Sequence, residues 1–173
     1  MLETERMWLC AWEPDDWRVL APIVQDAEVA RYLGDGQPFT EERVREFVQR
    51  QCTGLTRNGF CMWQPVLKAT GEPLGFCGLQ PLVETELIEI GWVFARTHWK
   101  HGLAREAARA AMRFGFASAG LPELVAVIAP PNAASIRVAE ALGMRYRRQR
   151  VHQGFEVAEY AMSKEQWSMT MGP

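Results

Sequence analysis

The segment "THWKHGLAREAARAAMRFGF", from Thr97 to Phe116, decides how the fold can be read. It opens with basic residues around Gly102 and continues as an alanine-rich amphipathic helix. The preceding run, "TELIEIGWVF", alternates as a strand, with Glu89 on the face opposite Ile88, Ile90, Trp92 and Phe94. We therefore predict a strand-to-helix turn that leaves the first amides of the helix unpaired.

This turn has the composition of an anion site. Unpaired amides and the positive end of a helix favour an anion, and Gly102 lets the backbone approach it closely. Lys100 and Arg105 add positive charge. Neither G-x-x-x-x-G-K-[ST] nor G-x-G-x-x-G occurs, so the usual mononucleotide and dinucleotide signatures are missing. The residues predict a pyrophosphate cradle, and a tight turn with solvated basic side chains is the structural alternative.

The rest of the chain predicts a mixed α/β sheet. We expect a helix from Pro14 toward Tyr32 and a second one capped by Thr40. The runs "FCMWQPVLKA" and "PLGFCGLQPL" predict a hairpin, and "ELVAVIAP" predicts a central strand buried on both faces. A helix should begin at Asn132 and end at Gly143, before a hairpin around Gln153 and a loose tail, "SMTMGP". The order implies a parallel crossover appended to an antiparallel meander.

Composition limits the kind of protein. With 173 residues and 48% hydrophobic residues, one domain over 1–173 is expected, with its core at about 2–167. The net charge of −2 offers no general attraction to nucleic acid or to an anionic membrane. No signal peptide or long apolar run is visible, so we expect a soluble, cytoplasmic protein. The four cysteines lack metal-site spacing and are predicted to be reduced packing residues, with no metal bound: Cys10, Cys52, Cys61 and Cys77.

Four stretches in one order carry a resemblance to a known family. They are "TERMWLCAWEPDDW", "KATGEPLGFCGL", "IEIGWVFARTHWKHGLAREA" and "NAASIRVAEALGM". Together they resemble the GCN5-related N-acetyltransferase (GNAT) superfamily, in particular its RimJ/RimL-type branch, over about Leu2 to Trp167. The acyl-CoA motif of the superfamily is Q/R-x-x-G-x-G/A. The stretch Trp99 to Ala104 keeps its glycine and final small residue, and has Trp at the first position, which members of the branch tolerate.

The resemblance implies a GNAT-like mixed sheet: an antiparallel N-terminal meander, a splayed parallel pair at the acyl-CoA site, and helices on both faces. It implies acetyl-CoA as cosubstrate. Amides from His101 to Arg105 would bind the pyrophosphate, Asn132 would bind the pantetheine amide, and Ser135 would lie near the sulfur. The implied acetyl-CoA-binding residues are Trp92, Val93, Phe94, Trp99, Lys100, His101, Gly102, Leu103, Ala104, Arg105, Asn132 and Ser135.

The chemistry needs a base for the attacking amine and a way to release the thiolate. Glu89 is the predicted base, because its strand runs toward the expected thioester, with His152 and Glu156 as alternatives. Many superfamily members protonate the thiolate with a Tyr whose position is Ala139 here. Ser135 or a water would then serve as the acid, although a thiol pKa near ~8.5 lets the thiolate leave with little help.

The acceptor amine is open from sequence. A protein N-terminus, a polyamine, an amino acid or an amine antibiotic all fit, and a homodimer is left open. The missing Tyr keeps a non-catalytic acyl-CoA sensor as the alternative function. Nucleic-acid binding through a basic strand is disfavoured by the whole-chain charge, and solubilising a sheet edge is the preferred explanation of Arg145, Arg147, Arg148 and Arg150.

Overall fold

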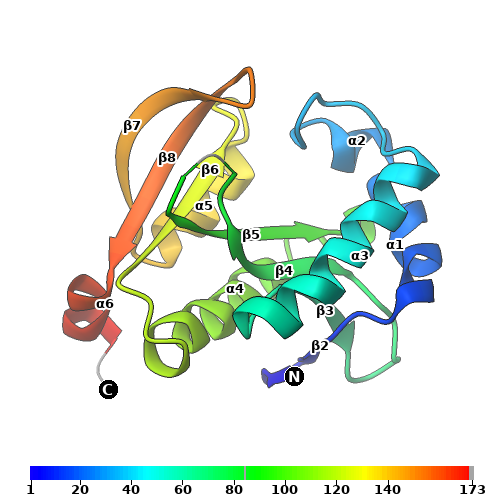
Figure 1. Cartoon of the computed structure of the whole chain (residues 1–173), viewed down its shortest axis with the longest axis horizontal. Coiled ribbons are helices and arrows are strands. Elements are labelled where there is room, and N and C mark those ends of the chain that lie inside the picture. Colours follow the sequence, from blue (N-terminus) through cyan, green and yellow to red (C-terminus); the bar gives the residue numbers. More distant parts are fainter. Residues whose placement is uncertain (84, 172–173) are drawn as a thin grey trace.

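The computed structural model describes residues 1–83 and 85–171, and its centre is one mixed sheet. Eight strands follow the order β1-β2-β3-β4-β5-β6-β8-β7 (Figure 1). Every neighbouring pair is antiparallel except β5 and β6, which run parallel. The strands are β1 (Leu2–Glu3), β2 (Met7–Cys10), β3 (Met62–Leu67), β4 (Gly75–Pro81), β5 (Ile88–Phe94), β6 (Glu123–Ile128), β7 (Arg145–His152) and β8 (Phe155–Ser163).

The helices connect these strands and cover them. The described chain contains the α-helices α1 (Trp17–Val24), α2 (Ala27–Ala30), α3 (Glu41–Asn58), α4 (Leu103–Arg113), α5 (Ala133–Ala141) and α6 (Lys164–Met171). Short 3₁₀ turns precede α1 and α4, namely η1 (Pro14–Asp16) and η2 (Arg96–His98), and a π-helical turn, η3 (Phe114–Ser118), extends α4. This order of elements confirms the predicted meander followed by a parallel crossover.

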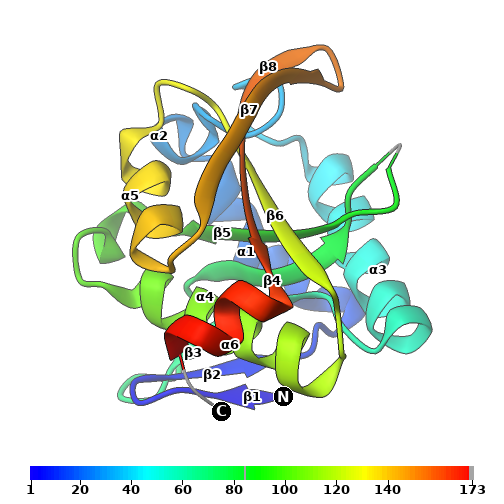
Figure 2. The same cartoon turned by 90° about the vertical axis from the view of Figure 1, so that its left-hand side faces the viewer.

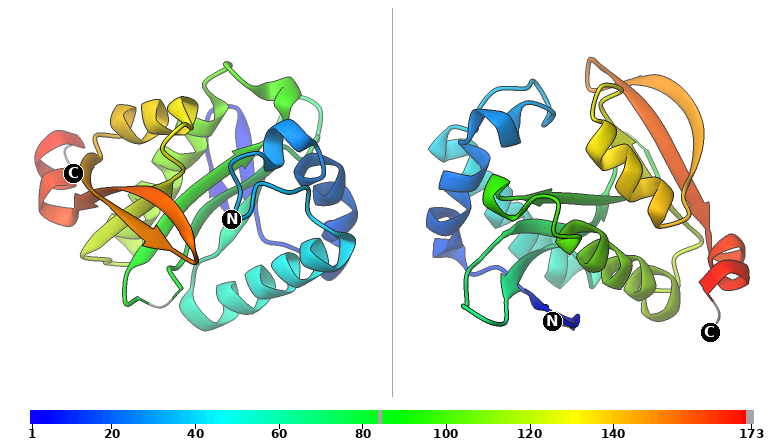
Figure 3. Two further views of the ribbon diagram at one scale, coloured as in Figure 1. Left: turned by 90° about the horizontal axis from the view of Figure 1, so that it is seen from above. Right: turned by 180° about the vertical axis from the view of Figure 1, so that it is seen from behind.

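Aromatic contacts show which helix covers which face of the sheet. Phe76 of β4 packs against Phe47 of α3, with ring centroids 4.6 Å apart. Trp63 of β3 packs on the other side against Phe114, at 5.2 Å. The views agree: α1, α2 and α3 lie to one side of the sheet, whereas α4 and α5 lie behind it (Figures 1 and 3). The prediction of helices on both faces is confirmed.

Local sequence signals explain the main boundaries. Thr40 caps α3 by accepting a hydrogen bond from Arg43 N at 3.2 Å, as its position predicted. Gly71, with φ of 73°, makes the turn between β3 and β4, and β6 is buried on both faces as expected. The hairpin predicted around Gln153 is formed by β7 and β8.

Two expectations need correction. The helix expected from Pro14 to Tyr32 is divided, because Asp26 accepts a hydrogen bond from Glu28 N at 2.9 Å and starts α2 anew. The expected loose tail is partly helical: its residues 168–171 form the second half of α6, and Trp167 in the same helix packs on Phe116 with ring centroids 5.4 Å apart. Of this tail, residues 172–173 lie outside the described part of the chain.

The described residues also bear on the predicted environment and cysteine chemistry. No helix among them combines the length and apolar character needed to cross a bilayer. All four cysteines are free thiols. Burial raises the pKa of Cys61 to about 12, and it raises the pKa of Cys77 even more strongly. Such thiols stay protonated and act as packing residues.

Candidate active site

The predicted cradle is a tightly folded loop between β5 and α4. Lys100 and Gly102 both have left-handed backbones, with φ of 65° and 77°. Gly102 is the N-cap residue, and its carbonyl accepts the first helical bond from Glu106 N at 3.1 Å. Trp99 fixes the start of the loop, because its Nε1 donates to Phe94 O at 2.7 Å. The amides that follow Gly102 open the helix and have no partner within it.

Sequence reasoning missed a clamp that holds this loop. Arg6, just before β2, donates through Nε to Glu106 Oε2 at 2.7 Å and through Nη1 to His101 O at 2.9 Å. Its backbone N–H donates to the other oxygen of Glu106 at 2.8 Å. Burial would raise the pKa of Glu106, but hydrogen bonds from Thr4 and Arg6 outweigh it and lower that pKa. The N-terminal segment therefore fixes the cradle with a charged pair.

The strands beside the cradle separate. β4 and β5 pair from Gly75↔Phe94 to Pro81↔Ile88, whereas β5 and β6 share the single pair Glu89↔Val125. Trp92, Val93 and Phe94 therefore have ladder partners on β4 but none on β6 within the described chain. Figure 2 shows β5 and β6 crossing at a wide angle. The predicted splayed parallel pair is confirmed, and it opens on the side that leads to the cradle.

Glu89 lies at the point where the strands separate. It faces the α3 side of the sheet, since its cross-strand neighbour Gln80 donates to Glu89 Oε2 at 2.8 Å and also contacts Gln51 of α3. Burial raises the pKa of the Glu89 carboxyl to about 7, and the hydrogen bond from Gln80 opposes that rise. A half-buried carboxylate with this pKa can take up a proton near neutral pH.

Asn132 and Ser135 begin helix α5. Asn132 Oδ1 accepts a hydrogen bond from Ser135 N at 3.1 Å, so Asn132 is the helix cap that its residue type suggested. The cap uses the side-chain oxygen, and Nδ2 is not part of it. Ala139, at the position of the usual Tyr acid, is fully buried in the core. The alanine side chain has no proton to donate, so position 139 supplies no acid in this chain.

The alternative bases are placed away from this strand junction. His152 and Glu156 lie at the tip of the β7–β8 hairpin, where His152 pairs with Phe155 and Val151 pairs with Glu156. Glu156 is exposed and lies beyond the end of the β6 ladder, whose last pair is Ile128↔Ala158. Among the three candidates, only Glu89 belongs to the strand that leads into the cradle.

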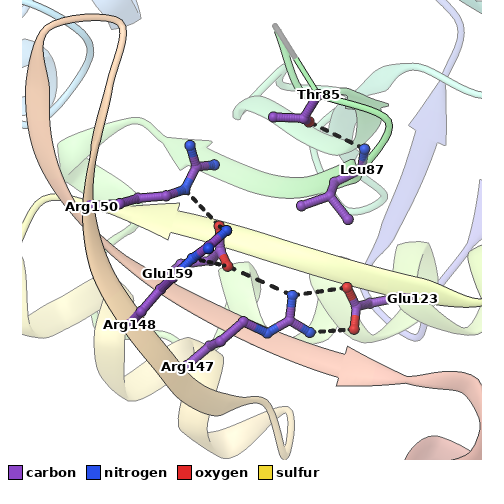
Figure 4. A network of polar contacts seen from close by, with 7 residues as sticks. All are labelled: Thr85, Leu87, Glu123, Arg147, Arg148, Arg150 and Glu159. Atoms are coloured by element: carbon purple, nitrogen blue, oxygen red, sulfur yellow. Dashed lines mark hydrogen bonds and ion pairs between the residues drawn. The ribbon is translucent and has the colours of Figure 1, made fainter.

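The arginines of β7 are ion-paired on one side of the sheet rather than simply solvated. Glu159, completely buried on β8, accepts from Arg150 Nε at 2.7 Å and from Arg148 Nε at 3.2 Å (Figure 4). Arg147 binds Glu123 and lies 3.6 Å from Glu159. The preferred explanation, solubilisation of an edge, is therefore incomplete: β7 is an edge strand, but three of its arginines neutralise buried or half-buried acids. Arg145 is exposed.

Glu159 and Glu89 face the same side of the sheet. Glu89 pairs with Val125, and Glu159 pairs with Val127, two residues further along β6. Side chains two residues apart on a strand share a face. Among residues 1–83 and 85–171, no group of three or more His, Cys, Asp or Glu side chains could hold a metal ion. This face of the sheet thus carries Glu89, whose pKa is raised, and the ion-pair cluster around Glu159.

Comparisons with known proteins agree with this geometry. Residues 6–145 match the Acetyltransferase (GNAT) domain model. The chain is 36% identical over 148 residues to the uncharacterized Bacillus subtilis protein YkkB, covering 84% of this chain and 85% of the relative. It is 32% identical over 147 residues to the uncharacterized N-acetyltransferase p20 of Bacillus licheniformis, covering 83% and 82%. A GNAT-family acetyltransferase from Bacillus anthracis superposes with a TM-score of 0.81 at 28% identity, over 95% and 98% of the chains.

The chain belongs to the GNAT acetyltransferase family. The predicted family, fold class and enzyme class are thereby confirmed. The RimJ/RimL-type branch stays a prediction, as do the roles of the individual site residues.

Proposed function

We propose that this chain transfers an acetyl group from acetyl-CoA to a primary amine, on a small molecule or a protein N-terminus, by direct attack on the thioester. One observation carries the proposal: the β5–β6 separation begins at Glu89 and opens toward the Gly102 cradle. An extended pantetheine arm can pair with the unpaired edge of β5, while the cradle amides and Lys100 hold the pyrophosphate.

The residues divide the chemistry as follows. The amine nitrogen attacks the carbonyl carbon, the carbon–sulfur bond breaks, and the electron pair leaves on sulfur. Glu89 accepts the proton lost by the amine, directly or through one water, since its carboxylate titrates near pH 7. Ser135 or a water donates a proton to the departing thiolate, which leaves with little help because the pKa of its thiol is near ~8.5. Positioning of the two reactants supplies most of the rate gain.

Solved relatives support the ligand class. The aminoglycoside acetyltransferase AAC(6')-Ib has been solved with paromomycin and acetyl-CoA; it superposes with a TM-score of 0.79 at 16% identity, over 98% of this chain and 99% of that chain. At that identity the likeness concerns the fold alone. A cleft of the same fold that accommodates acetyl-CoA and an amine is consistent with the proposed reaction.

The direct test is CoA release with a panel of amines. The purified chain is incubated with acetyl-CoA and, in turn, amino acids, polyamines, aminoglycosides and peptides with free N-termini. Free thiol is followed with a disulfide reagent, and the acetylated product is identified by mass. We expect amine-dependent CoA release for at least one class. Acetyl-CoA binding without release for any class would favour the sensor, the function suggested by buried Ala139.

The cradle is tested by Gly102→Glu. A glutamate at a left-handed position is strained, and it brings negative charge and bulk to the expected pyrophosphate. CoA affinity should fall about a hundredfold, because one lost charge-assisted contact plus repulsion costs about 3 kcal/mol. Gly120→Glu is the matched control, a left-handed glycine with open space around it and remote from the loop. Equal CoA affinities in calorimetric titrations of the folded variants would contradict the placement.

A further inference from the structure

A row of side-chain amides connects strand β3 to Glu89. Met62 N donates to Gln51 Oε1 at 3.0 Å. Gln51 Nε2 then donates to Gln80 Oε1 at 3.4 Å, and Gln80 Nε2 donates to Glu89 Oε2 at 2.8 Å. The row crosses from β3 through α3 and β4 to β5, so four elements converge on one carboxylate.

The direction of every bond in this row is fixed by its first member. A backbone N–H can only donate, so Gln51 must present its oxygen to Met62. Its NH₂ group then faces Gln80 and can only donate, so Gln80 must accept with its oxygen. Gln80 is left with its NH₂ group toward Glu89. The row therefore always ends in a donor, which suits an ionised carboxylate.

The anchor of the row is rigid. Gln51 is 3% exposed, and the Met62 carbonyl accepts a hydrogen bond from Trp12 Nε1, so the backbone of Met62 is held on both sides. Gly78 lets β3 lie close to β4, because a Cβ there would come 2.9 Å from Met62 Cα. Because Met62 and Gln51 are held in place, the hydrogen bonds of the row also fix the orientation of the Gln80 side chain.

We propose that Gln80, oriented by Gln51, is a positioning residue that holds one oxygen of Glu89 and aims the other at the acceptor amine. This inference rests on the proposed function, in which Glu89 is the base. Gln80 itself need not touch the substrate. Its donated hydrogen bond also opposes the rise that burial causes in the pKa of Glu89.

The first experiment measures the titration of Glu89 without any substrate. Carbon-13 spectra of side-chain carboxyl-labelled glutamate, assigned with Glu89→Gln, give the pKa in the wild type and in Gln80→Leu. Removing the donor should raise the pKa of Glu89 by about one unit, the usual effect of one hydrogen bond to a charged group. Gln64→Leu is the matched control, because it removes a buried side-chain amide of the neighbouring strand β3 that is not part of the row.

A second variant reverses the row without removing it. In Gln51→Glu the new carboxylate accepts from both Met62 and Gln80, so Gln80 must turn its oxygen toward Glu89. The pKa of Glu89 should rise at least as far as in Gln80→Leu, since its donor becomes an acceptor. Gln80→Met repeats the first test with an unbranched side chain, and thermal melts verify that each variant is folded.

Kinetics then separate positioning from simple structural support. With a verified acceptor, Gln80→Leu should lose about tenfold in turnover near neutral pH and recover at higher pH, where more amine is already neutral. Acetyl-CoA affinity should not change. A pKa of Glu89 equal to wild type in Gln80→Leu, or turnover reduced equally at every pH, would overturn the inference. Failure of the proposed function would instead appear as no CoA release by the wild type.

Discussion

Glu89 and Glu159 lie on the same face of one sheet, but the pKa of Glu89 is raised and that of Glu159 is lowered. Glu89 accepts its hydrogen bond from a neutral amide, Gln80, and its pKa is raised to about 7 by burial. Glu159 accepts from Arg148 and Arg150, and these bonds lower its pKa although burial acts to raise it. The charge of the partner, more than burial itself, decides which acid can exchange a proton.

This difference in pKa gives the two acids different parts in the molecule: Glu159 stabilises the sheet, and Glu89 can titrate near neutral pH. Glu159 stays ionised and links β8 to the edge strand β7, while Arg147 extends the network to Glu123 on β6 (Figure 4). Glu89 lies where β5 and β6 separate, and burial raises its pKa to about 7, so it can gain or lose a proton near neutral pH. The carboxylate proposed as the base thus accepts its hydrogen bond from a neutral amide and not from an arginine that would hold it ionised.

Glu159→Gln should give the largest effect in the molecule. It leaves three arginines around a neutral, fully buried amide, and breaking a buried ion pair from one side costs about 3–5 kcal/mol in the free energy of unfolding. Urea denaturation measures this loss. Glu156→Gln, an exposed position on the same strand, should change stability by less than about 0.5 kcal/mol. If Glu159→Gln and Glu156→Gln were equally stable, the Glu159 ion pairs would not stabilise the fold, and the contrast between Glu159 and Glu89 would be lost.

Glu89→Gln should lower turnover, whereas Glu159→Gln lowers stability. It nearly preserves shape but cannot accept a proton, so turnover should fall about a hundredfold or more near neutral pH while acetyl-CoA affinity stays the same. The loss should shrink as pH rises and the amine becomes neutral. Glu86→Gln, an exposed acid just before β5, is the control. Wild-type turnover in Glu89→Gln would transfer the role of base to His152 or Glu156.

Glu89→Gln and Glu159→Gln should also differ in how their stability depends on pH. Glu89 has a folded pKa of about 7, above its unfolded value near ~4.3, so its ionisation weakens the fold as pH rises between these values. Glu89→Gln should therefore gain about 1–3 kcal/mol on the wild type between pH 5 and 8. Glu159 has a lowered pKa, so its contribution is present above ~4.3 and is lost as pH falls below it. Parallel pH profiles of the two variants would refute the assignment.

Arg147→Lys gives the smallest expected effect and sharpens the description of the ion-pair region. Lysine keeps the charge but loses the two-pronged bond to Glu123, which is only partly exposed. The free energy of unfolding should fall by about 1 kcal/mol. Arg145→Lys, at an exposed position, should have no measurable effect. A loss as large as that of Glu159→Gln would make Arg147 the principal partner of Glu159.

Local patterns were sufficient to locate the strand of Glu89, the turn at Gly102 and the cap at Asn132, because each depends on residues close in sequence. The partners of the site residues were not predictable in this way. Gln80 meets Glu89 only through the register of β4 and β5, and Arg6 reaches Glu106 across 100 residues. A single sequence gives propensities and periods but neither register nor docking.

The helix boundaries were also predictable only in part, because some depend on local capping and others on contacts with distant residues. The start of α6 had a readable signal, since Ser163 and Gln166 form a reciprocal cap: Ser163 N donates to Gln166 Oε1 and Gln166 N to Ser163 Oγ. The apolar pattern of "KEQWSMTM" was too weak to reveal the helix, whose Trp167 packs on Phe116. The break before α2 depends on Asp26, and aspartate is as common in loops and turns as it is at helix caps, so its residue type did not reveal the break.

The Arg6 clamp also has a consequence for the time course of folding. Its bonds to His101 and Glu106 join residues 95 and 100 positions apart, so they close one of the longest loops in the chain. Contacts this distant cost the most chain entropy, and folding that depends on them is slow. We therefore expect the cradle to take its final shape late, once both halves of the chain have met. A refolding sample should regain most of its helical signal before it regains affinity for CoA.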